Sequence, residues 1–388
     1  SSNGLEKRPK LRFPGFDKPW KVFKAEELFQ NITDKNHPDE TVLTIIQGKG
    51  TLPREQAGRN IHYDDASLSN YKKVEQGDFI IHLRSFEGGL EMANEAGIVS
   101  PAYTILRCKR PHSSLFYDAY FHTDEFINHN LSKSVEGIRD GRQISYEAFK
   151  WLGIPYCEPT EQEKISNLFA ALNERIAKQR DLIEALKKYK RGLLMHYFSD
   201  DKTQLWTQCS VSQIGKVITG STPPTNDRSN YDGDLLFCAP GDVGEQKYIS
   251  STEKRVSPKG FALGRPLPPN SVIVTCIGLI GKLGIAKTSM ITNQQINALV
   301  VSEGFDHEFI YYAFENFFPE YRSKVSMQTL PILSKSEFEK LMIKVPDLDV
   351  QHKISSHLAA MDRRIEHTQQ ELNALIEHRR GIMQQLFI

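Results

Sequence analysis

The chain is poor in cysteine, has no long apolar run and carries almost no net charge. Its five cysteines among 388 residues are far apart, odd in number and form no C-x-x-C pair. This usage argues against a disulfide framework or a zinc site and fits a reducing compartment. No apolar stretch reaches the ~20 residues of a bilayer span, and the start of the chain shows no secretory-signal pattern. We therefore expect a cytoplasmic protein with buried thiols, no metal site and no membrane association.

The net charge of +1 bears on nucleic acid as a ligand. A protein that neutralises many phosphates alone usually carries a clear basic excess. Either DNA is not the ligand, or the basic groups gather on one face, or a partner supplies much of the phosphate contact. We favour the last two together. The length predicts two or more domains, and the 39% hydrophobic and 25% charged residues are ordinary for a globular protein.

The sequence does contain an internal repeat. The segment from Ile165 to Ile176 reappears from Ile354 to Ile365, 189 positions later, and the match continues without a gap to Phe198 and Phe387. Repeats of this length identify the structural unit of a fold. The repeat predicts a tandem duplication: a mixed domain over residues 1–158, a helix over 159–200, a second mixed domain over 201–346 and a second helix over 347–388. Near the start of each half, Trp20-Lys21-Val22 has an expected counterpart in Trp206 and Val211.

Both predicted helices carry apolar residues in alternating steps of four and three, which is the heptad seam of a coiled coil. The apolar seam positions are Ile165, Phe169, Leu172, Ile176, Ile183 and Leu186 in the first helix, and Ile354, Leu358, Met361, Ile365, Leu372 and Leu375 in the second. Two further seam positions are polar in both copies, Gln179 with Thr368 and Lys190 with Arg379. Polar seam residues cost stability but can fix the register of a helix pair.

The duplication favours pairing of the two helices over packing of each helix on its own domain. Each helix starts near acidic residues and ends with basic ones, so antiparallel pairing would place each basic end beside the other acidic start. A helix of about 38 residues spans roughly 57 Å. We expect two domains separated by an antiparallel coiled coil, related by a pseudo-two-fold axis, with the helices acting as a ruler.

The centres of the two domains show short β-rich runs between turn residues, which predicts an α+β fold. Expected strands lie at 42–46, 79–83 and 102–107 in the first domain, and at 235–239, 272–277, 283–287 and 298–301 in the second. Expected helices lie at 309–317 and 336–343.

Several loops of these domains combine basic, amide and aromatic side chains. Such residues can bind base edges or simply hold phosphate. The DNA-contact candidates are Lys49, Arg54, Arg59, His62, Arg84 and Ser85 in the first domain, and Thr222, Asn226, Arg228, Lys247, Tyr248, Lys282 and Gln294 in the second. For each residue alone, an ordinary solvated loop is the favoured interpretation, and Asn293 and Gln294 could instead bond strand backbone.

The repeated helix resembles that of the specificity subunits of type I restriction-modification enzymes. The resemblance lies in Glu161-Gln162-Glu163-Lys164-Ile165 and the later Lys190-Arg191-Gly192, and in their second copies. The second copy has Val350 where the family has an acid. The stretch from Gly220 to Tyr231, with Gly278 to Gly284 and Asn293-Gln294, resembles a target-recognition domain of the family. The first domain keeps this pattern poorly, with Ser100-Pro101-Ala102 where the second has Asn293-Gln294-Gln295.

The resemblance implies a non-catalytic DNA-binding subunit that serves host defence. Each recognition domain would read one half of a split, asymmetric site in double-stranded DNA, and the helices would set the unread gap. Two methyltransferase subunits would dock on the helices, and restriction (motor-nuclease) subunits would join for cleavage. S-adenosylmethionine, ATP and Mg²⁺ would be bound by those partners, with no cofactor in this chain.

Two rival functions remain at this point. An adenine methyltransferase would need an N-P-P-[FY]-like motif, whereas the chain has only Thr222-Pro223-Pro224-Thr225. The run Gly278-Leu279-Ile280-Gly281-Lys282 is too short for a phosphate-binding loop, and no Ser or Thr follows the lysine. The other rival is a coiled-coil adaptor without DNA readout, which DNA-binding assays on the partner complex would distinguish.

Overall fold

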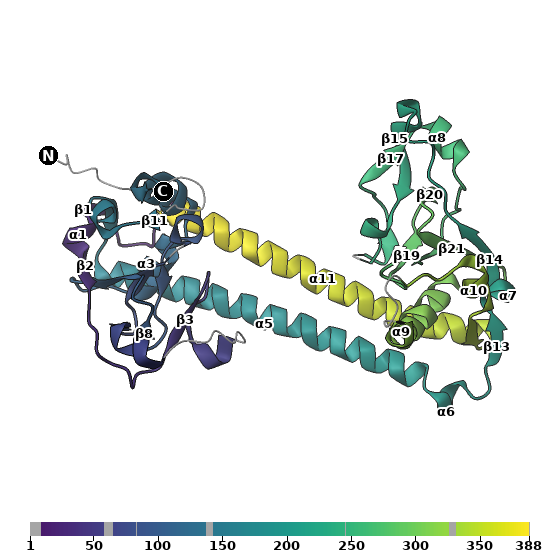
Figure 1. The fold of residues 1–388 in the computed structure, drawn as a ribbon, viewed down its shortest axis with the longest axis horizontal. Coiled ribbons are helices and arrows are strands. Elements are labelled where there is room, and N and C mark those ends of the chain that lie inside the picture. Colours follow the sequence, from purple (N-terminus) through teal and green to yellow (C-terminus); the bar gives the residue numbers. More distant parts are fainter. Residues whose placement is uncertain are drawn as a thin grey trace. The chain divides into compact units, whose positions relative to one another are not determined.

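The computed structural model describes residues 9–57, 65–82, 84–136, 143–244, 246–325 and 331–387. The chain divides into two compact units (Figure 1). Unit 1 consists of Ser1–Arg180 and Gln370–Ile388, and unit 2 of Asp181–Gln369. Both long helices therefore contribute residues to both units. The helix and strand segments predicted from the sequence are present, with different ends.

Unit 1 is built on a four-stranded antiparallel sheet in the order β2-β9-β6-β7. The α3 helix packs on it, and Phe79 of the sheet contacts Tyr117 and Phe121 of the helix. The strands are β1 (Lys21–Lys24), β2 (Phe29–Ile32), β3 (Leu43–Ile46), β4 (Gly50–Pro53), β5 (Lys72–Val74), β6 (Phe79–Ile81), β7 (Glu91–Met92), β8 (Gly97–Val99), β9 (Thr104–Cys108), β10 (Val135–Glu136), β11 (Gln143–Ile144) and β12 (Gly153–Tyr156). The helices are α1 (Ala25–Leu28), α2 (Ser85–Gly88), α3 (Ser114–Phe121), α4 (Tyr146–Phe149) and the first part of α5 (Pro159–Tyr197).

Unit 2 has a five-stranded sheet in the order β14-β21-β18-β19-β16 and a three-stranded sheet in the order β17-β15-β20. Its strands are β13 (Thr207–Ser210), β14 (Gly215–Thr219), β15 (Tyr231–Cys238), β16 (Tyr248–Ile249), β17 (Lys254–Val256), β18 (Val272–Thr275), β19 (Leu283–Ala286), β20 (Met290–Thr292), β21 (Ile296–Val301) and β22 (Met342–Val345). Its helices are the last part of α5, α6 (Asp200–Thr203), α7 (Val211–Ile214), α8 (Pro258–Leu263), α9 (His307–Val325), α10 (Lys335–Lys340) and the first part of α11 (Leu348–Phe387), whose last part belongs to unit 1.

The two units repeat one order of elements. In unit 1, β1 pairs antiparallel with β12 immediately before α5; in unit 2, β13 pairs antiparallel with β22 immediately before α11. A short helix then leads to the first sheet strand, and α3 and α9 follow the matched strands β9 and β21. The duplication read from the helices thus extends through both domains.

Two details of the expected correspondence change. Trp20 and Trp206 each stand one residue before the first strand, as predicted, but Val22 lies in β1 and Val211 begins α7. The expected pairing of Val22 with Val211 is therefore wrong, because Val211 matches Ala25 at the start of α1. The helix expected over 336–343 ends at Lys340, since Met342 already belongs to β22.

Each unit has a core that takes side chains from both long helices. In unit 1, Phe169 of α5 and Met383, Leu386 and Phe387 of α11 join the apolar cluster around α3. In unit 2, Leu194 of α5 and residues Ile354 and Leu358 of α11 join the cluster around α9. The apolar seam residues predicted from the heptads are mostly buried, from Ile165 at 1% exposure to Ile183 at 3% and Leu358 at 0%.

The described helices include none that is both long and apolar enough to cross a membrane. In the same residue ranges, no group of three or more His, Cys, Asp or Glu side chains is arranged to hold a metal ion.

Candidate nucleic-acid interface

Four strand ends meet at one edge of the five-stranded sheet of unit 2. Thr219, the last residue of β14, pairs with Asn297 of β21, and Thr275, the last of β18, pairs with Ile296. β19 begins at Leu283, opposite Val274. The connections 220–230, 276–282 and 293–295 therefore emerge at this edge, which we call the loop edge of unit 2.

Three sequence candidates lie at this loop edge. Thr222 donates a hydrogen bond from Oγ1 to Oε1 of Gln294 at 2.7 Å, and both side chains are exposed. Lys282 is half-buried and lies beside Gly244, since a Cβ atom on that glycine would be 3.5 Å from Cδ of the lysine. The structure thus brings Thr222, Gln294 and Lys282 to one side of the sheet. Asn293 instead accepts from the backbone N–H of Gln295, the local role foreseen as its alternative.

The other candidates of unit 2 lie in different settings. Asn226 and Arg228 are exposed on a loop that a 2.7 Å ion pair between Asp227 and Lys259 holds in place. Lys247 is only 13% exposed at its side chain, and its ammonium pairs with Glu308 at 2.8 Å. The hydroxyl of Tyr248 donates to the same carboxylate. These last two side chains are therefore engaged in the interior of unit 2.

Unit 1 has the same edge. β2 ends at Ile32, β6 at Ile81, and β7 and β9 begin at Glu91 and Thr104. Arg84 lies in the connection between β6 and β7 and is exposed. Its neighbour Ser85 is fully buried and accepts a hydrogen bond from the backbone N–H of His82 at 2.9 Å. Of this candidate pair, only Arg84 faces solvent.

Lys49 stands at the tip of the hairpin between β3 and β4, between two glycines with left-handed backbone, Gly48 (φ 73°) and Gly50 (φ 77°). Their N–H groups donate to the buried carboxylate of Glu91 at 2.7 and 2.9 Å. The side chain of Asn94 donates to the carbonyl of Lys49 at 2.7 Å. The hairpin is thus fastened to the start of β7 while Lys49 itself is exposed. A loop ordered in advance loses less entropy on binding.

Sequence reasoning missed Glu91 and Asn94, although the two glycines around Lys49 marked a turn. Arg54 directly follows β4, with its guanidinium 6.0 Å from the centre of the Tyr71 ring. Arg59 and His62 lie outside the described residues.

The Glu91 carboxylate is buried and lies beside the imidazole of His122. Burial alone would raise the pKa of Glu91, but the hydrogen bond from His122 and the two glycine N–H groups lower it overall. Burial would lower the pKa of His122, but Glu91 and Asp118 raise it overall. The imidazole Nε2 is 3.4 Å from Oε1 of Glu91, and Nδ1 is 3.6 Å from Asp118. Glu91 therefore contacts His122 and accepts from both glycines of the hairpin at the same time.

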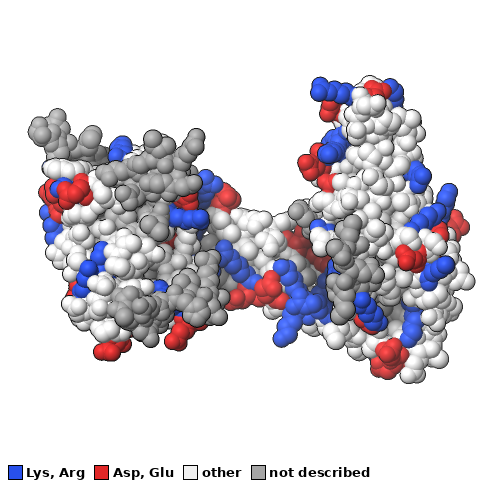
Figure 2. Space-filling model, viewed as in Figure 1, with Lys and Arg blue, Asp and Glu red and all other residues white. Residues whose placement is uncertain are grey.

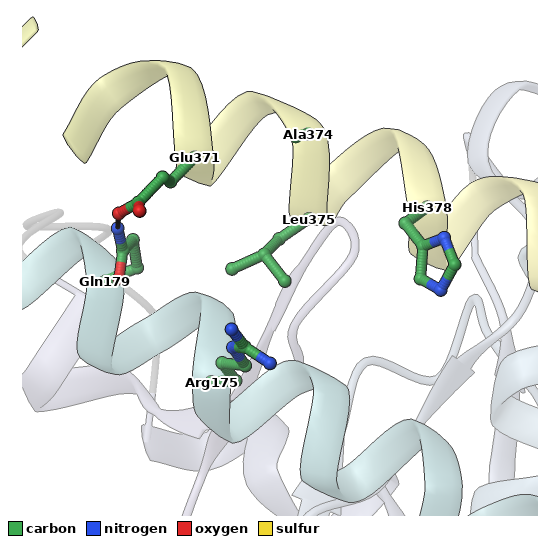
Figure 3. A pocket seen from close by; sticks show the side chains of 6 residues that line it. All are labelled: Arg175, Gln179, Glu371, Ala374, Leu375 and His378. Atoms are coloured by element: carbon green, nitrogen blue, oxygen red, sulfur yellow. Dashed lines mark hydrogen bonds between the residues drawn. The ribbon is translucent and has the colours of Figure 1, made fainter. Parts of the chain in front are cut away.

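Within unit 1 the two long helices run antiparallel. Phe169 of α5 stacks on Phe387 of α11, while Gln179, later in α5, donates to Glu371, earlier in α11, at 2.8 Å. Leu375 points from α11 toward α5 between them (Figure 3). The helices leave an open pocket of about 460 Å³ here, lined by Arg175, Gln179, Glu371, Ala374, Leu375 and His378.

The helix segments of unit 2 are also antiparallel. Lys190 of α5 pairs with Asp362 of α11 at 2.7 Å, and Tyr197, further along α5, contacts His357, earlier in α11. The seam residue Thr368 donates to the carbonyl of Arg364 in its own helix. The predicted direction of pairing therefore holds in each unit.

Basic and acidic side chains are interspersed on the face of the molecule shown in Figure 2. In this view neither the basic nor the acidic side chains gather into one large patch of a single sign.

Comparison with known proteins gives sequence matches over part of the chain and fold matches over nearly all of it. The model of the type I restriction modification DNA specificity domain matches residues 204–378. The chain is 30% identical over 178 residues to the specificity subunit of the type I restriction enzyme MjaIX of Methanocaldococcus jannaschii, covering 44% of this chain and 41% of that one. It is 29% identical over 108 residues to the HindI specificity subunit of Haemophilus influenzae, covering 27% and 24%. The matches thus span less than half the length of either relative.

Solved structures share the fold over nearly the whole chain. The S subunit of a type I restriction-modification system from M. genitalium superposes with a TM-score of 0.59 at 15% identity, covering 98% of this chain and 99% of that one. A chain from work on complex assembly and conformational transition of the type I R-M system gives 0.61 at 17% identity, covering 97% and 99%. Residues 204–378 therefore match a type I restriction modification DNA specificity domain, and the chain as a whole has the fold of the solved S subunit.

Proposed function

We propose that the chain is the non-catalytic subunit that gives a type I restriction-modification complex its DNA sequence specificity. Each recognition domain reads one half of a bipartite, asymmetric site in double-stranded DNA. The observation that carries the proposal is the loop edge, which recurs in both units with different side chains. Thr222 and Gln294 stand at one edge, and Arg84 and Lys49 at or beside the other. Amide, hydroxyl and basic side chains are those that bind base edges and phosphates.

Different residues at matching edges support two different half-sequences. The residues before β9 are Pro101-Ala102-Tyr103, whereas those before β21 are Asn293-Gln294-Gln295. Direct readout depends on the donors and acceptors that a loop presents, so these edges would select different bases. The partner supplies much of the phosphate contact, in keeping with the net charge of +1.

The long helices serve as the docking surface for two methyltransferase subunits, and restriction subunits join for cleavage. The partners bind S-adenosylmethionine, ATP and Mg²⁺, while this chain contributes recognition. Because α5 and α11 each supply core residues to both units, the helices can hold the two readers at a set spacing along DNA. The length of the gap between half-sites follows from these helices.

The test is to express the chain with its methyltransferase partner and map methylated adenines across a genome. A bipartite motif with a fixed gap is expected. Replacing residues 220–230 and 293–295 by those of a relative should change one half of the motif and leave the other half and the gap intact. The matched control replaces the turn at 268–270, at the opposite edge of the same sheet.

Two outcomes would contradict this function. A complex that methylates DNA without sequence preference, or that does not bind DNA, would favour the coiled-coil adaptor. An exchange at 220–230 and 293–295 that alters both halves of the motif would contradict the assignment of one half-site to each domain.

A further inference from the structure

Lys190 occupies a heptad seam position, yet its ammonium bonds outside the helix pair as well as within it. Nζ lies 2.7 Å from Oδ1 of Asp362 on α11 and 2.9 Å from Oε1 of Glu315 on α9. It also lies 5.2 Å from the centre of the Tyr312 ring on α9. Three helices of unit 2 therefore meet at one ammonium group, whose side chain is 11% exposed.

The contacts continue from this ammonium into the recognition sheet. The hydroxyl of Tyr312 donates to Asp362 at 2.5 Å and accepts from Nζ of Lys247 at 2.9 Å. The backbone carbonyl of Lys247 in turn accepts from the N–H of Ile285 in β19 at 2.7 Å. Polar contacts thus run without a break from the helix pair, through α9, to a strand whose start lies at the loop edge of unit 2.

The energetics argue against a role in stability alone. Removing charges from water is costly, and an apolar residue at a buried seam position is often as stable as an ion pair. The same seam is filled by leucine at Leu186, one step earlier, and by isoleucine at Ile183, two steps earlier. A buried ion pair is directional, however, whereas apolar contacts allow sliding and rotation. A register role within the coiled coil would not need Glu315, which belongs to the domain helix.

Burial and charge act together at this junction. Burial would lower the pKa of Lys190, but Glu315 and Asp362 raise it overall. Burial raises the pKa of Glu315 despite the nearby lysine, and Oε2 of Glu315 is buried with no hydrogen-bond partner in the described ranges. Lys190 therefore provides most of the compensation for this buried carboxylate, with a smaller contribution from Lys247.

We propose that Lys190 is a positioning residue, which fixes the orientation of the second recognition domain on the two helices and thereby the gap length that the complex accepts. The inference rests on the proposed function. With the ammonium in place, α9 has one favoured orientation on α5 and α11. Without it, the domain can adopt neighbouring orientations, and sites with a gap one base pair longer or shorter become acceptable.

The test measures methylation rates by the assembled complex on DNA sites with the natural gap and with gaps one base pair longer and shorter. The main variant carries Lys190→Met, Glu315→Gln and Asp362→Asn, which removes the charges and keeps the side-chain volumes. We expect its preference for the natural gap to fall by about tenfold, the equivalent of ~1.4 kcal/mol. The single variant Lys190→Arg, which keeps a positive charge between the two carboxylates, should keep most of the preference.

Two controls separate positioning from folding. Lys187→Met removes a lysine of the same helix that is 46% exposed and pairs with Glu184 one turn earlier, and it should leave gap preference unchanged. Ile273→Val shortens a fully buried side chain of β18, so it should lower the melting temperature without changing gap preference.

The outcomes are distinct. If the wild-type complex shows no fixed gap, the proposed function and the inference both fail. If the wild type has a fixed gap and the triple variant keeps it, only the role of Lys190 is overturned, as it is if Ile273→Val relaxes the gap equally. Should the triple variant not fold, Glu315→Gln alone decides: a relaxed gap supports the inference, and an unchanged gap overturns it.

Discussion

The two units attach their domains to the long helices with the same aromatic triad. In unit 1, Trp20, Phe116 of α3 and Phe387 of α11 have ring centres 5.3 to 6.1 Å apart. In unit 2, the triad of Trp206, Phe309 of α9 and Phe198 after α5 has ring centres 5.6 to 5.8 Å apart. In each unit, an aromatic residue at the C-terminal end of one long helix packs in the core near the start of the other long helix.

A buried glutamine repeats this agreement. Gln162 accepts from the N–H of Ser113, just before α3, and donates to the carbonyl of Cys157. Gln351 likewise accepts from the N–H of Asp306, just before α9, and donates to the carbonyl of Pro346. Free N–H groups at a helix start need such acceptors. The glutamine of the repeated helix therefore ties the domain helix to the long helix in both units.

The units differ at two other positions of the repeated helix, where Glu161 matches Val350 and Lys190 matches Arg379. Glu161 binds Arg12 and Trp20 in unit 1, but its counterpart Val350 is 37% exposed. Lys190 is bonded to two carboxylates, whereas burial lowers the pKa of its counterpart Arg379, and Nε of that guanidinium is buried with no partner in the described part of the chain. The two copies therefore share the aromatic triads and the buried glutamines that attach each domain to the long helices. They differ in the charged groups at Glu161 and Lys190 and in the side chains of the loop edges.

The largest effect is expected from breaking the triads. Phe387→Ala should lower the free energy of unfolding by about 3–5 kcal/mol, because the ring is fully buried. Phe198→Ala should cost less, near the lower end of that range, since Phe198 is only half-buried. Chemical denaturation followed by circular dichroism measures both. Phe387→Leu, which keeps most of the apolar contact, should cost less than ~1.5 kcal/mol. Losses below that value for both alanine variants would contradict the role of the triads in attaching the domains to the long helices.

A smaller loss is expected from Glu161→Gln, which tests an attachment found in unit 1 alone. The carboxylate is 2% exposed and accepts from Arg12 through both oxygens at 2.9 Å and from Nε1 of Trp20 at 3.1 Å. Neutralising it leaves a largely buried guanidinium without its counter-charge, at a cost of about 2 kcal/mol. Val350→Gln at the matching position of unit 2 should change stability by less than ~0.5 kcal/mol. Similar losses from the two variants would show that the units do not differ here.

The sequence predicted the periodic features of this molecule and missed its long-range polar contacts. The heptad pattern identified the seam residues of both long helices, and the short β-rich runs located β3, β18 and β21. Each of these patterns can be read from a single continuous segment of the chain. The candidates Arg84 and Thr222 were found by residue type, which cannot separate exposed Arg84 from buried Ser85 next to it.

The missed contacts join residues far apart in the chain. Glu91 is 41 or more positions from the glycines it binds, and Lys190 is 125 positions from Glu315. No spacing rule connects such pairs. The repeat was aligned on the long helices, and this alignment paired Val22 with Val211. The pairing is wrong because the two halves differ in length: the number of residues between Trp206 and α9 is not the same as that between Trp20 and α3.

The smallest effect, and the one most specific to unit 1, concerns pH. His122 directly follows α3, and the matching position in α9, counted from Phe116 and Phe309, is Glu315. Unit 1 therefore has an imidazole where unit 2 has a carboxyl group. Because Glu91 and Asp118 raise the pKa of His122 in the folded state, its contribution to stability is fully present below the unfolded value of ~6.5 and is lost as pH rises through the folded pKa. Denaturation from pH 5.5 to 8.5 should show a gap between wild type and His122→Gln that narrows with rising pH.

The stability difference between wild type and His122→Gln has to be measured, because neighbouring groups also titrate. Burial lowers the pKa of His82 near Glu91 and raises that of Asp118, so the wild-type curve alone combines several titrations. Glu91 has a lowered pKa and contributes stability above its unfolded value of ~4.3, which is lost only as pH falls through the folded pKa, below the window tested. His129→Gln, at a side chain that is 67% exposed, is the matched control and should leave the wild-type profile unchanged. A His122→Gln curve parallel to wild type across the whole range would mean that the hairpin of Lys49 is held by Glu91 without help from a protonated imidazole, and that the two units do not differ in their response to pH at this position.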